Sequence, residues 1–424
     1  MRMRSEWLGS PLVRLGLLVA LLAAGLVPVM SRGGQWLGSW KLALDWGTSS
    51  VILLGPVAAG IACGVYARIH RAGLADLLGQ AVRPWRGWVT PALAVWGLAG
   101  TALLLLCGFT TTAAWLAGAT AYPHLWWVVL PALLVLGAQV ALGGLVGGLT
   151  GRYWAVPWVA VGTFVLFILT SIGVIPVVFD TGGATGTLAG QTYSPPWFAF
   201  QSVVAVGVAA TAMTVSNREL FRVSPLPWKL GTGAAAGAAA LTLVFVDAPL
   251  ERYEPVRSIG YECRDGRPRV CMTEDARRPL DDLATKMQRL AGALEAAGAH
   301  LPDRFVHARP GSTPAQDAGV LRLFVDEVLA ERVGYPAAAE SLTTPAPCAA
   351  YSSDDPRDLP ETWFAVNATL VRWLLVQEGE ESVPSGDHPM ADWWALPVEQ
   401  QYAWVRATYS ALRDCRLRDL RLPR

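Results

Sequence analysis

The sequence predicts a polytopic α-helical membrane protein of about seven spans, followed by a helix-rich α+β domain. Residues 1–246 carry thirteen basic and five acidic residues, whereas residues 247–424 carry 21 basic and 28 acidic residues. The two parts therefore have net charges of +8 and −7, which indicates different surroundings. No Asp, Glu, Lys or Arg occurs between Ala92 and Gly151. A soluble core seldom runs that long without charge, so we expect a transmembrane domain over 1–246 and a soluble domain over 247–424.

Seven hydrophobic runs have about the length that crosses a bilayer. They lie near residues 12–30, 49–67, 91–114, 125–149, 154–178, 197–216 and 230–246. The first run also has features of a signal peptide, because Arg2 and Arg4 precede it, but its length and the inclusion of Arg14 favour a span. The last run is the weakest, since it is rich in alanine and glycine.

The loop charges orient these spans. With the N-terminus inside, eleven basic residues fall in the inner segments, and only Arg32 and Lys41 fall in the outer loops. This asymmetry has the sign of the positive-inside rule. We therefore expect a bacterial cell-membrane protein with a cytoplasmic N-terminus and an extracytoplasmic domain over 247–424.

Pairs of glycines four residues apart recur within the spans, and in lipid such pairs let helix backbones approach closely. They are Gly60 and Gly64, Gly143 and Gly147, and Gly233 and Gly237. They predict either helix packing within one chain or the seam of a dimer.

The spans offer no coupling group for ion-driven transport. No carboxylate or lysine occupies the centre of a span, whereas ion-coupled carriers use ionisable groups there. The chain also lacks a GxxxxGK[ST] loop, so energy for transport would come from another subunit. No HExxH or GxSxG motif occurs, and we expect neither an enzyme nor a bound metal or cofactor.

The longest inner loop, residues 67–91, reads ARIHRAGLADLLGQAVRPWRGWVTP. Leu74, Leu77 and Leu78 share one face if the segment is helical, and arginines flank it. A basic amphipathic segment of this kind either grips lipid headgroups of the bilayer or docks on a cytosolic partner.

The six core spans, this basic loop and the glycine-rich fourth span resemble permease subunits of type-2 ABC exporters, in particular divergent actinobacterial members. The resemblance covers roughly residues 1–225. It implies a homodimer or heterodimer that pairs with a separate ATP-binding subunit. The implied docking residues are Arg68, Arg71, Leu74, Asp76, Leu77 and Leu78. The chain departs from the family pattern by adding a seventh span and a C-terminal domain.

The C-terminal domain is expected to contain a hairpin over 262–272 around Asp265-Gly266 and helices over 280–294, 361–377 and 398–412. The stretch 319–330 suits either a strand or a helix. This domain also holds four of the six cysteines.

An even number of cysteines in an extracytoplasmic domain indicates two disulfides, and four cysteines allow three pairings. We expect Cys263–Cys271 across the hairpin and Cys348–Cys415 closing a long loop, the latter worth about 4 kcal/mol. A zinc site is the alternative, although CxxC spacing is lacking. The pattern of this domain also resembles outer domains of actinobacterial membrane proteins encoded with ABC systems.

Two functions remain. The first is the membrane subunit of an ATP-driven exporter for a hydrophobic or peptidic compound. The alternative is a non-transporting receptor, immunity or accessory protein that acts through its outer domain. Nucleic-acid binding is not expected, since arginine-rich composition with little lysine fits a high-GC genome better. A membrane-embedded enzyme is the weakest reading, because no polar cluster is expected inside the bilayer.

Overall fold

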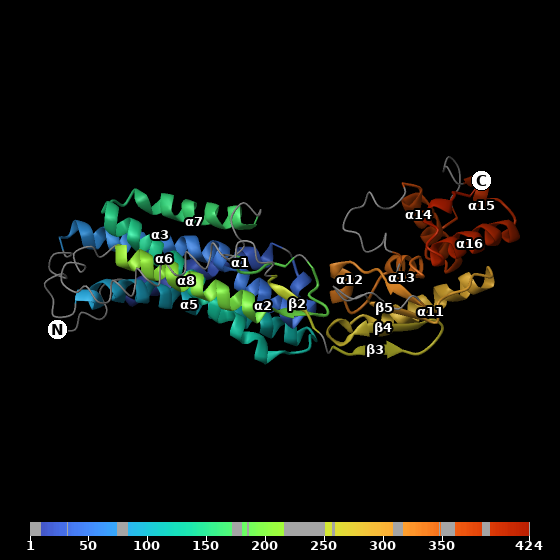
Figure 1. The fold of residues 1–424 in the computed structure, drawn as a ribbon, viewed down its shortest axis with the longest axis horizontal. Coiled ribbons are helices and arrows are strands. Elements are labelled where there is room, and N and C mark those ends of the chain that lie inside the picture. The colour runs from blue at the N-terminus through green and yellow to red at the C-terminus, as the bar shows by residue number, and fades with distance from the viewer. Residues whose placement is uncertain are drawn as a thin grey trace. The chain divides into compact units, whose positions relative to one another are not determined.

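The computed structural model describes residues 10–31, 33–73, 84–171, 180–184, 186–215, 251–256, 259–307, 317–346, 348, 361–383 and 391–423. The chain divides into two compact units (Figure 1). A membrane unit comprises Met1–Thr185 and Thr192–Glu254, and a C-terminal unit comprises Gly186–Gln191 and Pro255–Arg424. The division at residue 254 falls eight residues after the one expected from charge.

The membrane unit is built of helices. They are α1 (Pro11–Met30), η1 (Gln35–Gly38), α2 (Trp40–Ser49), α3 (Val51–Arg71), α5 (Pro84–Leu116), η2 (Pro123–Val128), α6 (Val129–Thr150), α7 (Ala155–Ser171) and α8 (Pro195–Val215). Two short strands, β1 (Gln191–Tyr193) and β2 (Tyr253–Pro255), pair with each other.

Five of these helices are long and apolar enough to cross a bilayer, which identifies a membrane protein. They are Pro11–Met30, Trp40–Arg71, Val89–Leu116, Pro123–Thr150 and Pro195–Val215. The expected fifth span corresponds to α7, which has 17 described residues. The expected seventh span, 230–246, lies outside the described residues. The second span begins at Trp40 rather than near residue 49, because α2 and α3 follow each other with only Ser50 between them.

Close packing of α3 against α6 forms the centre of the membrane unit. A Cβ atom at Gly143 would collide with the carbonyl oxygen of Ala59, and one at Gly147 would collide with that of Cys63. These two glycines therefore let the helix backbones touch. A Cβ at Gly60 or Gly64 would only make ordinary contact with Val156 of α7, at 3.6 Å. All four thus serve packing within one chain, while Gly233 and Gly237 lie outside the described residues.

The outer faces of α1, α5 and α7 carry large exposed apolar side chains. They include Leu12, Leu15, Val19, Leu104, Leu105, Trp158 and Val161. A water-soluble protein rarely exposes contiguous apolar surface of this kind, whereas lipid covers it without cost.

The C-terminal unit combines a sheet with helices. Its elements are β3 (Tyr261–Arg264), β4 (Arg269–Thr273), η4 (Glu274–Ala276), α11 (Leu280–Ala296), β5 (Arg304–His307), β6 (Ala318–Leu321), α12 (Val325–Leu329), α13 (Tyr335–Leu342), α14 (Glu361–Gln377), α15 (Ala391–Trp394), α16 (Val398–Arg413) and η7 (Leu417–Asp419).

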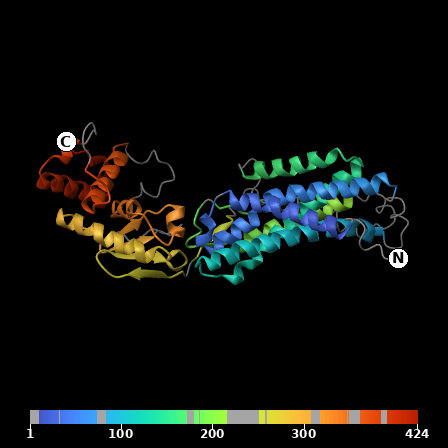
Figure 2. The ribbon, with the colours of Figure 1, turned by 180° about the vertical axis from the view of Figure 1, so that it is seen from behind.

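The sheet has the order β3-β4-β5-β6, in which β3 and β4 pair antiparallel and the other pairs are parallel. The expected hairpin is present as β3 and β4. Helix α11 makes the crossover from β4 to the parallel β5 and lies along the sheet, as Figures 1 and 2 show from opposite sides. The ambiguous stretch 319–330 resolves into both alternatives, a strand (β6) followed by a helix (α12).

The helices bury the apolar stripes that their spacing predicts. On α11 these are Leu280, Leu283, Met287, Leu290 and Leu294. On α16 they include Val405, Tyr409 and Leu412. Not every large apolar residue of α14 is buried, since the Phe364 side chain is 50% exposed. The core side of α14 is formed instead by Trp363, Val366, Leu370, Trp373 and Leu374.

Both expected disulfides are present, Cys263–Cys271 and Cys348–Cys415. The first joins directly opposite residues of β3 and β4. The second ties the chain ahead of α14 to the residue just past α16. Because all four cysteines are oxidised, they are not thiolate ligands for zinc.

Replacing Gly143 by Ala should destabilise the membrane unit by about 1–3 kcal/mol, because the new methyl group meets backbone rather than a movable side chain. Gly108→Ala on α5 is the matched control, since a Cβ there has no neighbour within 4 Å. Thermal unfolding of the full chain in detergent measures both variants. Equal melting temperatures would contradict the packing described for α3 and α6.

The two disulfides should differ in their contribution to stability. The loop closed by Cys348–Cys415 spans 67 residues and that closed by Cys263–Cys271 spans eight. Loop-closure entropy then predicts losses of about 4 and about 2.5 kcal/mol for the respective double serine variants. Pulse proteolysis of the full chain in urea, scored by cleavage within 255–424, measures this difference. A larger loss from the hairpin pair would reverse the expected order.

Candidate functional site

A buried ion pair and two partly buried polar neighbours lie at one end of the membrane unit, in a group that we call the ionic cluster: Asp45 and Arg252, with Asp180 and Tyr253. Asp45 lies on α2 and is completely buried. Its Oδ1 accepts hydrogen bonds from Arg252 Nη2 at 3.0 Å and from the Tyr253 hydroxyl at 2.8 Å. Its Oδ2 accepts the backbone N–H groups of Gly183 and Ala184 at 2.7 and 2.8 Å. Four donors thus satisfy one carboxylate.

Arg252 is the cationic centre of the ionic cluster. Its Nη1 donates to the backbone carbonyl of Asp180 at 2.6 Å, and Gln201 Nε2 donates to the same oxygen at 2.7 Å. Its guanidinium carbon lies 5.1 Å from the ring centroids of both Trp197 and Phe198. Cation–π contacts of this kind strengthen when water is excluded. Arg252 is therefore held by hydrogen bonds in its plane and by rings beside it.

Local sequence explains why Asp45 is so placed. Ser39 caps α2, where its Oγ accepts the N–H of Leu42 at 3.4 Å. Gly182 and Gly183 have φ values of +134° and +93°, which only glycine adopts without strain, and this loop turns backbone N–H groups toward the carboxylate. A Cβ at Gly182 would also collide with the backbone of Asp45.

The charges of the ionic cluster stabilise one another. Burial alone would lower the pKa of Arg252, but the carboxylate of Asp45 raises it above its ordinary value. Burial raises the pKa of Asp180, and Arg252 opposes that shift. Burial and the negative charge of Asp45 both raise the pKa of Tyr253 well above its usual range. Arg252 therefore stays charged and Tyr253 stays protonated, so the ion pair with Asp45 and the hydrogen bond from Tyr253 to Asp45 both persist.

The opposite end of the membrane unit is basic. From Asp45 to Arg68 the chain follows α2 and α3 over 23 residues, which corresponds to about 35 Å of helix and hence to the thickness of a bilayer core. Arg68, His70 and Arg71 form the last turn of α3. Arg71 lies over the ring of Tyr153 at 5.2 Å.

The basic end of α3 holds only part of the docking loop expected from the sequence. Arg68 and Arg71 belong to the last turn of α3, while Leu74, Asp76, Leu77 and Leu78 lie outside the described residues. The expected amphipathic face of this loop therefore stays a prediction.

A groove, which we call the lateral groove, opens between α5, α6 and α8 with a volume of about 300 Å³. Its wall is apolar and includes Leu93, Trp96, Gly137, Ala141, Ala209 and Met213. Trp96 Nε1 donates to the carbonyl of Leu133 on α6 at 2.8 Å. Gly137 leaves room for the indole, which approaches to 3.2 Å of the position a Cβ would take.

Sequence reasoning missed the ionic cluster. Asp45 was counted only as one of the five acidic residues of 1–246, and Lys41 was expected in an outer loop, although both are buried in α2. The available signal was a lone acid within the apolar stretch WKLALDWGTS. Its partner Arg252 lies 207 residues away, so no local pattern connects them. Among the described residues, no three His, Cys, Asp or Glu side chains form a group that suits a metal ion.

Comparison with models of protein families, with curated proteins and with solved structures gives no match for this chain. Function must therefore be argued from the geometry above.

Replacing Asp45 by Asn should destabilise the membrane unit by about 3 kcal/mol, because it removes the nearer counter-charge of the buried Arg252 guanidinium and leaves only Asp180, whose Oδ1 lies 4.0 Å from Nη1. The double variant Asp45→Asn with Arg252→Gln should recover part of this loss, since it removes the unpaired charge. Asp414→Asn, in an exposed ion pair, is the control and should have little effect. Thermal unfolding of the full chain in detergent measures all three. An Asp45→Asn variant as stable as the native chain would mean that the ion pair between Asp45 and Arg252 does not stabilise the membrane unit.

Proposed function

We propose that this chain is the membrane subunit of an ATP-driven ABC export system, which pairs with a separate ATP-binding subunit and moves a hydrophobic compound outward. The lateral groove is the observation that carries the proposal. A protein that only anchors an outer domain has no use for an apolar groove between its spans.

The lateral groove suits a substrate that is dissolved in the bilayer. Its lining is almost wholly apolar, and it lies between helices whose outer faces are also apolar. A hydrophobic molecule in the membrane reaches such a groove without crossing water, and a volume of about 300 Å³ is at the lower end of ordinary ligand pockets.

The helix pair α2–α3 provides a mechanical link for coupling. It runs from the ionic cluster to the basic turn with Arg68 and Arg71, where the docking loop begins. A movement imposed on that loop by an ATP-binding subunit would be carried along this helix to Asp45. We propose that the ionic cluster is the fixed point, at the outer end of the helix, about which this movement takes place.

Three observations support an extracytoplasmic C-terminal unit in this proposal. The basic turn of α3 marks the cytoplasmic end by the positive-inside rule. Arg252 and Tyr253, just ahead of the C-terminal unit, lie at the other end of that helix. Two disulfides also suit an oxidising compartment.

One observation favours a second candidate function, a non-transporting receptor, immunity or accessory protein. The C-terminal unit contains an open groove of about 460 Å³ with exposed aromatic surface, as a binding module would.

Purification of the tagged full chain from native membranes tests the export proposal. An ATP-binding subunit should copurify, and Arg68→Glu with Arg71→Glu should remove it, whereas Arg152→Glu at the same end should not.

A photoactivatable palmitate analogue should label the lateral groove, and Ala209→Phe with Ala210→Phe should reduce labelling about tenfold by filling it. Val161→Phe on the outer face of α7 is the matched control.

The outcomes separate the two functions. If no ATP-binding subunit accompanies the native chain, the export proposal fails and the receptor remains. If the subunit copurifies but labelling is unchanged in the variant Ala209→Phe with Ala210→Phe, the proposal of a hydrophobic substrate fails. The proposal of an ATP-binding partner subunit is then retained.

A further inference from the structure

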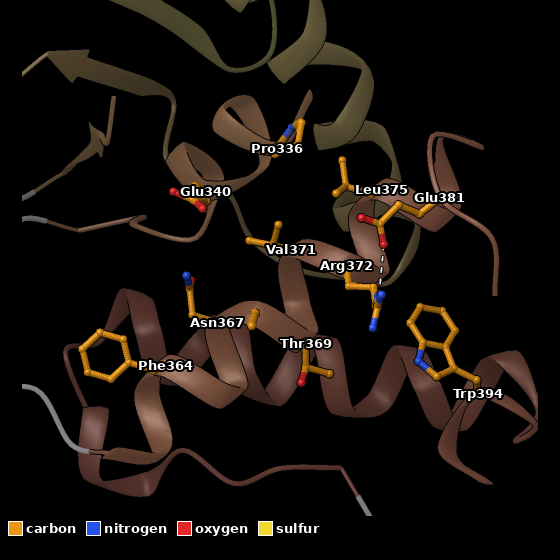
Figure 3. A pocket seen from close by; sticks show the side chains of 11 residues that line it. Pro336, Glu340, Phe364, Asn367, Thr369, Val371, Arg372, Leu375, Glu381 and Trp394 are labelled. Carbon is orange, nitrogen blue, oxygen red and sulfur yellow. Dashed lines mark hydrogen bonds and ion pairs between the residues drawn. The ribbon is translucent and has the colours of Figure 1, made fainter. Parts of the chain in front are cut away.

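We infer that the C-terminal unit binds an amphipathic peptide with basic side chains, in a groove formed by α13, α14 and the region of α15. Figure 3 shows this surface, which we call the α14 groove. The inference goes beyond the proposed function and does not depend on whether the chain transports anything.

Helix α14 has two apolar sides, and its core uses only one. Trp363, Val366 and Leu370 face the core and are at most 3% exposed. Phe364, Ala368 and Val371 belong to a second stripe, spaced three and four residues apart, and they line the α14 groove together with Leu375. Such spacing is how helices present anchors to a peptide partner. Val371 and Leu375 also pack in the unit's own core, so the apolar surface that the core leaves free is that of Phe364 and Ala368.

The length of the α14 groove fits a short peptide. Phe364 and Leu375 are eleven residues apart on one helix, or about 16 Å. An extended peptide covers that distance with about five residues. Phe364, 50% exposed, lies at one end of the view in Figure 3, and Trp394 lies at the other end. Trp394 is only 7% exposed and belongs to the core, so Phe364 is the aromatic side chain that can act as an anchor for an apolar side chain of a partner.

Polar groups in the α14 groove suit a peptide backbone better than a lipid chain. Oδ1 of Asn367 is buried and has no hydrogen-bond partner within the described part of the chain. Figure 3 shows the Asn367 side chain directed toward the middle of the groove. A buried acceptor without a donor costs free energy until a ligand N–H supplies one. The Thr369 hydroxyl donates to Ala365 at 2.8 Å and can still accept.

The charge around the α14 groove selects a cation. Arg372 is neutralised by Glu381, with Nε and Oε2 3.0 Å apart. Glu340 on α13 makes no ion pair among the described residues. Burial raises the pKa of Glu327, and the negative charges of Asp326 and of Glu340, which lines the groove, add to that shift. Residues 247–424 also carry a net charge of −7, which attracts basic peptides from solution.

Fluorescence anisotropy with the full chain in nanodiscs tests the inference, without ATP or any other subunit. The probe is a fluorescein-labelled peptide Leu-Lys-Phe-Lys-Leu, and its control is Leu-Glu-Phe-Glu-Leu. The basic peptide should bind, more weakly at higher salt, and the acidic one should not. Phe364→Ala should weaken binding about tenfold, and Glu340→Gln by about fivefold.

Matched controls are available on α16. Val398→Ala and Glu399→Gln remove an exposed apolar and an exposed acidic side chain that do not line the groove, and they should leave binding unchanged. Equal binding of both peptides, or native affinity in Phe364→Ala and Glu340→Gln, would overturn the inference. Because these side chains are at the surface or its edge, the variants are expected to fold, which circular dichroism checks.

Discussion

The membrane unit depends on the buried ion pair between Asp45 and Arg252. Removing two charges from water is costly, and their attraction repays that cost only when the remaining hydrogen-bonding groups are satisfied. Here the carboxylate has four donors, and the two terminal nitrogens of the guanidinium donate to Asp45 and the Asp180 carbonyl, while its Nε is buried without a partner among the described residues. The pair fastens the chain just ahead of the C-terminal unit to the end of α2. The path of residues 251–254 follows from this contact.

The packing of α3 against α6 sets the frame in which that ion pair forms. Gly143 and Gly147 bring the two backbones together, and the other spans arrange around them. In lipid there is little hydrophobic gain from bringing helices together, so close backbone approach is what holds such a bundle. The lateral groove lies on an adjoining side of α6, where Trp96 of α5 reaches across to the Leu133 carbonyl. Rigid packing on one side of α6 thus faces an opening on the other.

Much of this fold could be predicted from sequence because its signals are local. Hydrophobic length identified five of the seven expected spans, helical spacing identified α11, α14 and α16, and cysteine count with the Asp265-Gly266 turn led to the disulfide pairing. What could not be predicted is non-local. The parallel pairing of β4 with β5 joins segments on either side of a helix, and Asp45 meets Arg252 only after folding. Polar residues near Asp45 also lower the local hydropathy, which hid the first turns of the second span.

The α14 groove escaped prediction for a related reason. A helix with apolar residues on two sides has a weak periodic signal, and its sequence alone does not show that Trp363 is buried while Phe364 is exposed. Only the structure separates the side that packs inward from the side that faces the groove. The same difficulty applies to any helix that serves a core and a binding surface at once.

The guanidinium of Arg252 has a consequence for how this chain can vary. Its two terminal nitrogens point to different acceptors, the Asp45 carboxylate and the Asp180 carbonyl, while its flat face lies against Trp197. Lysine carries the same charge but has one nitrogen and no plane. A lysine at this position would keep the charge but would lose one of the two acceptors, so the geometry of the site requires arginine rather than any basic residue.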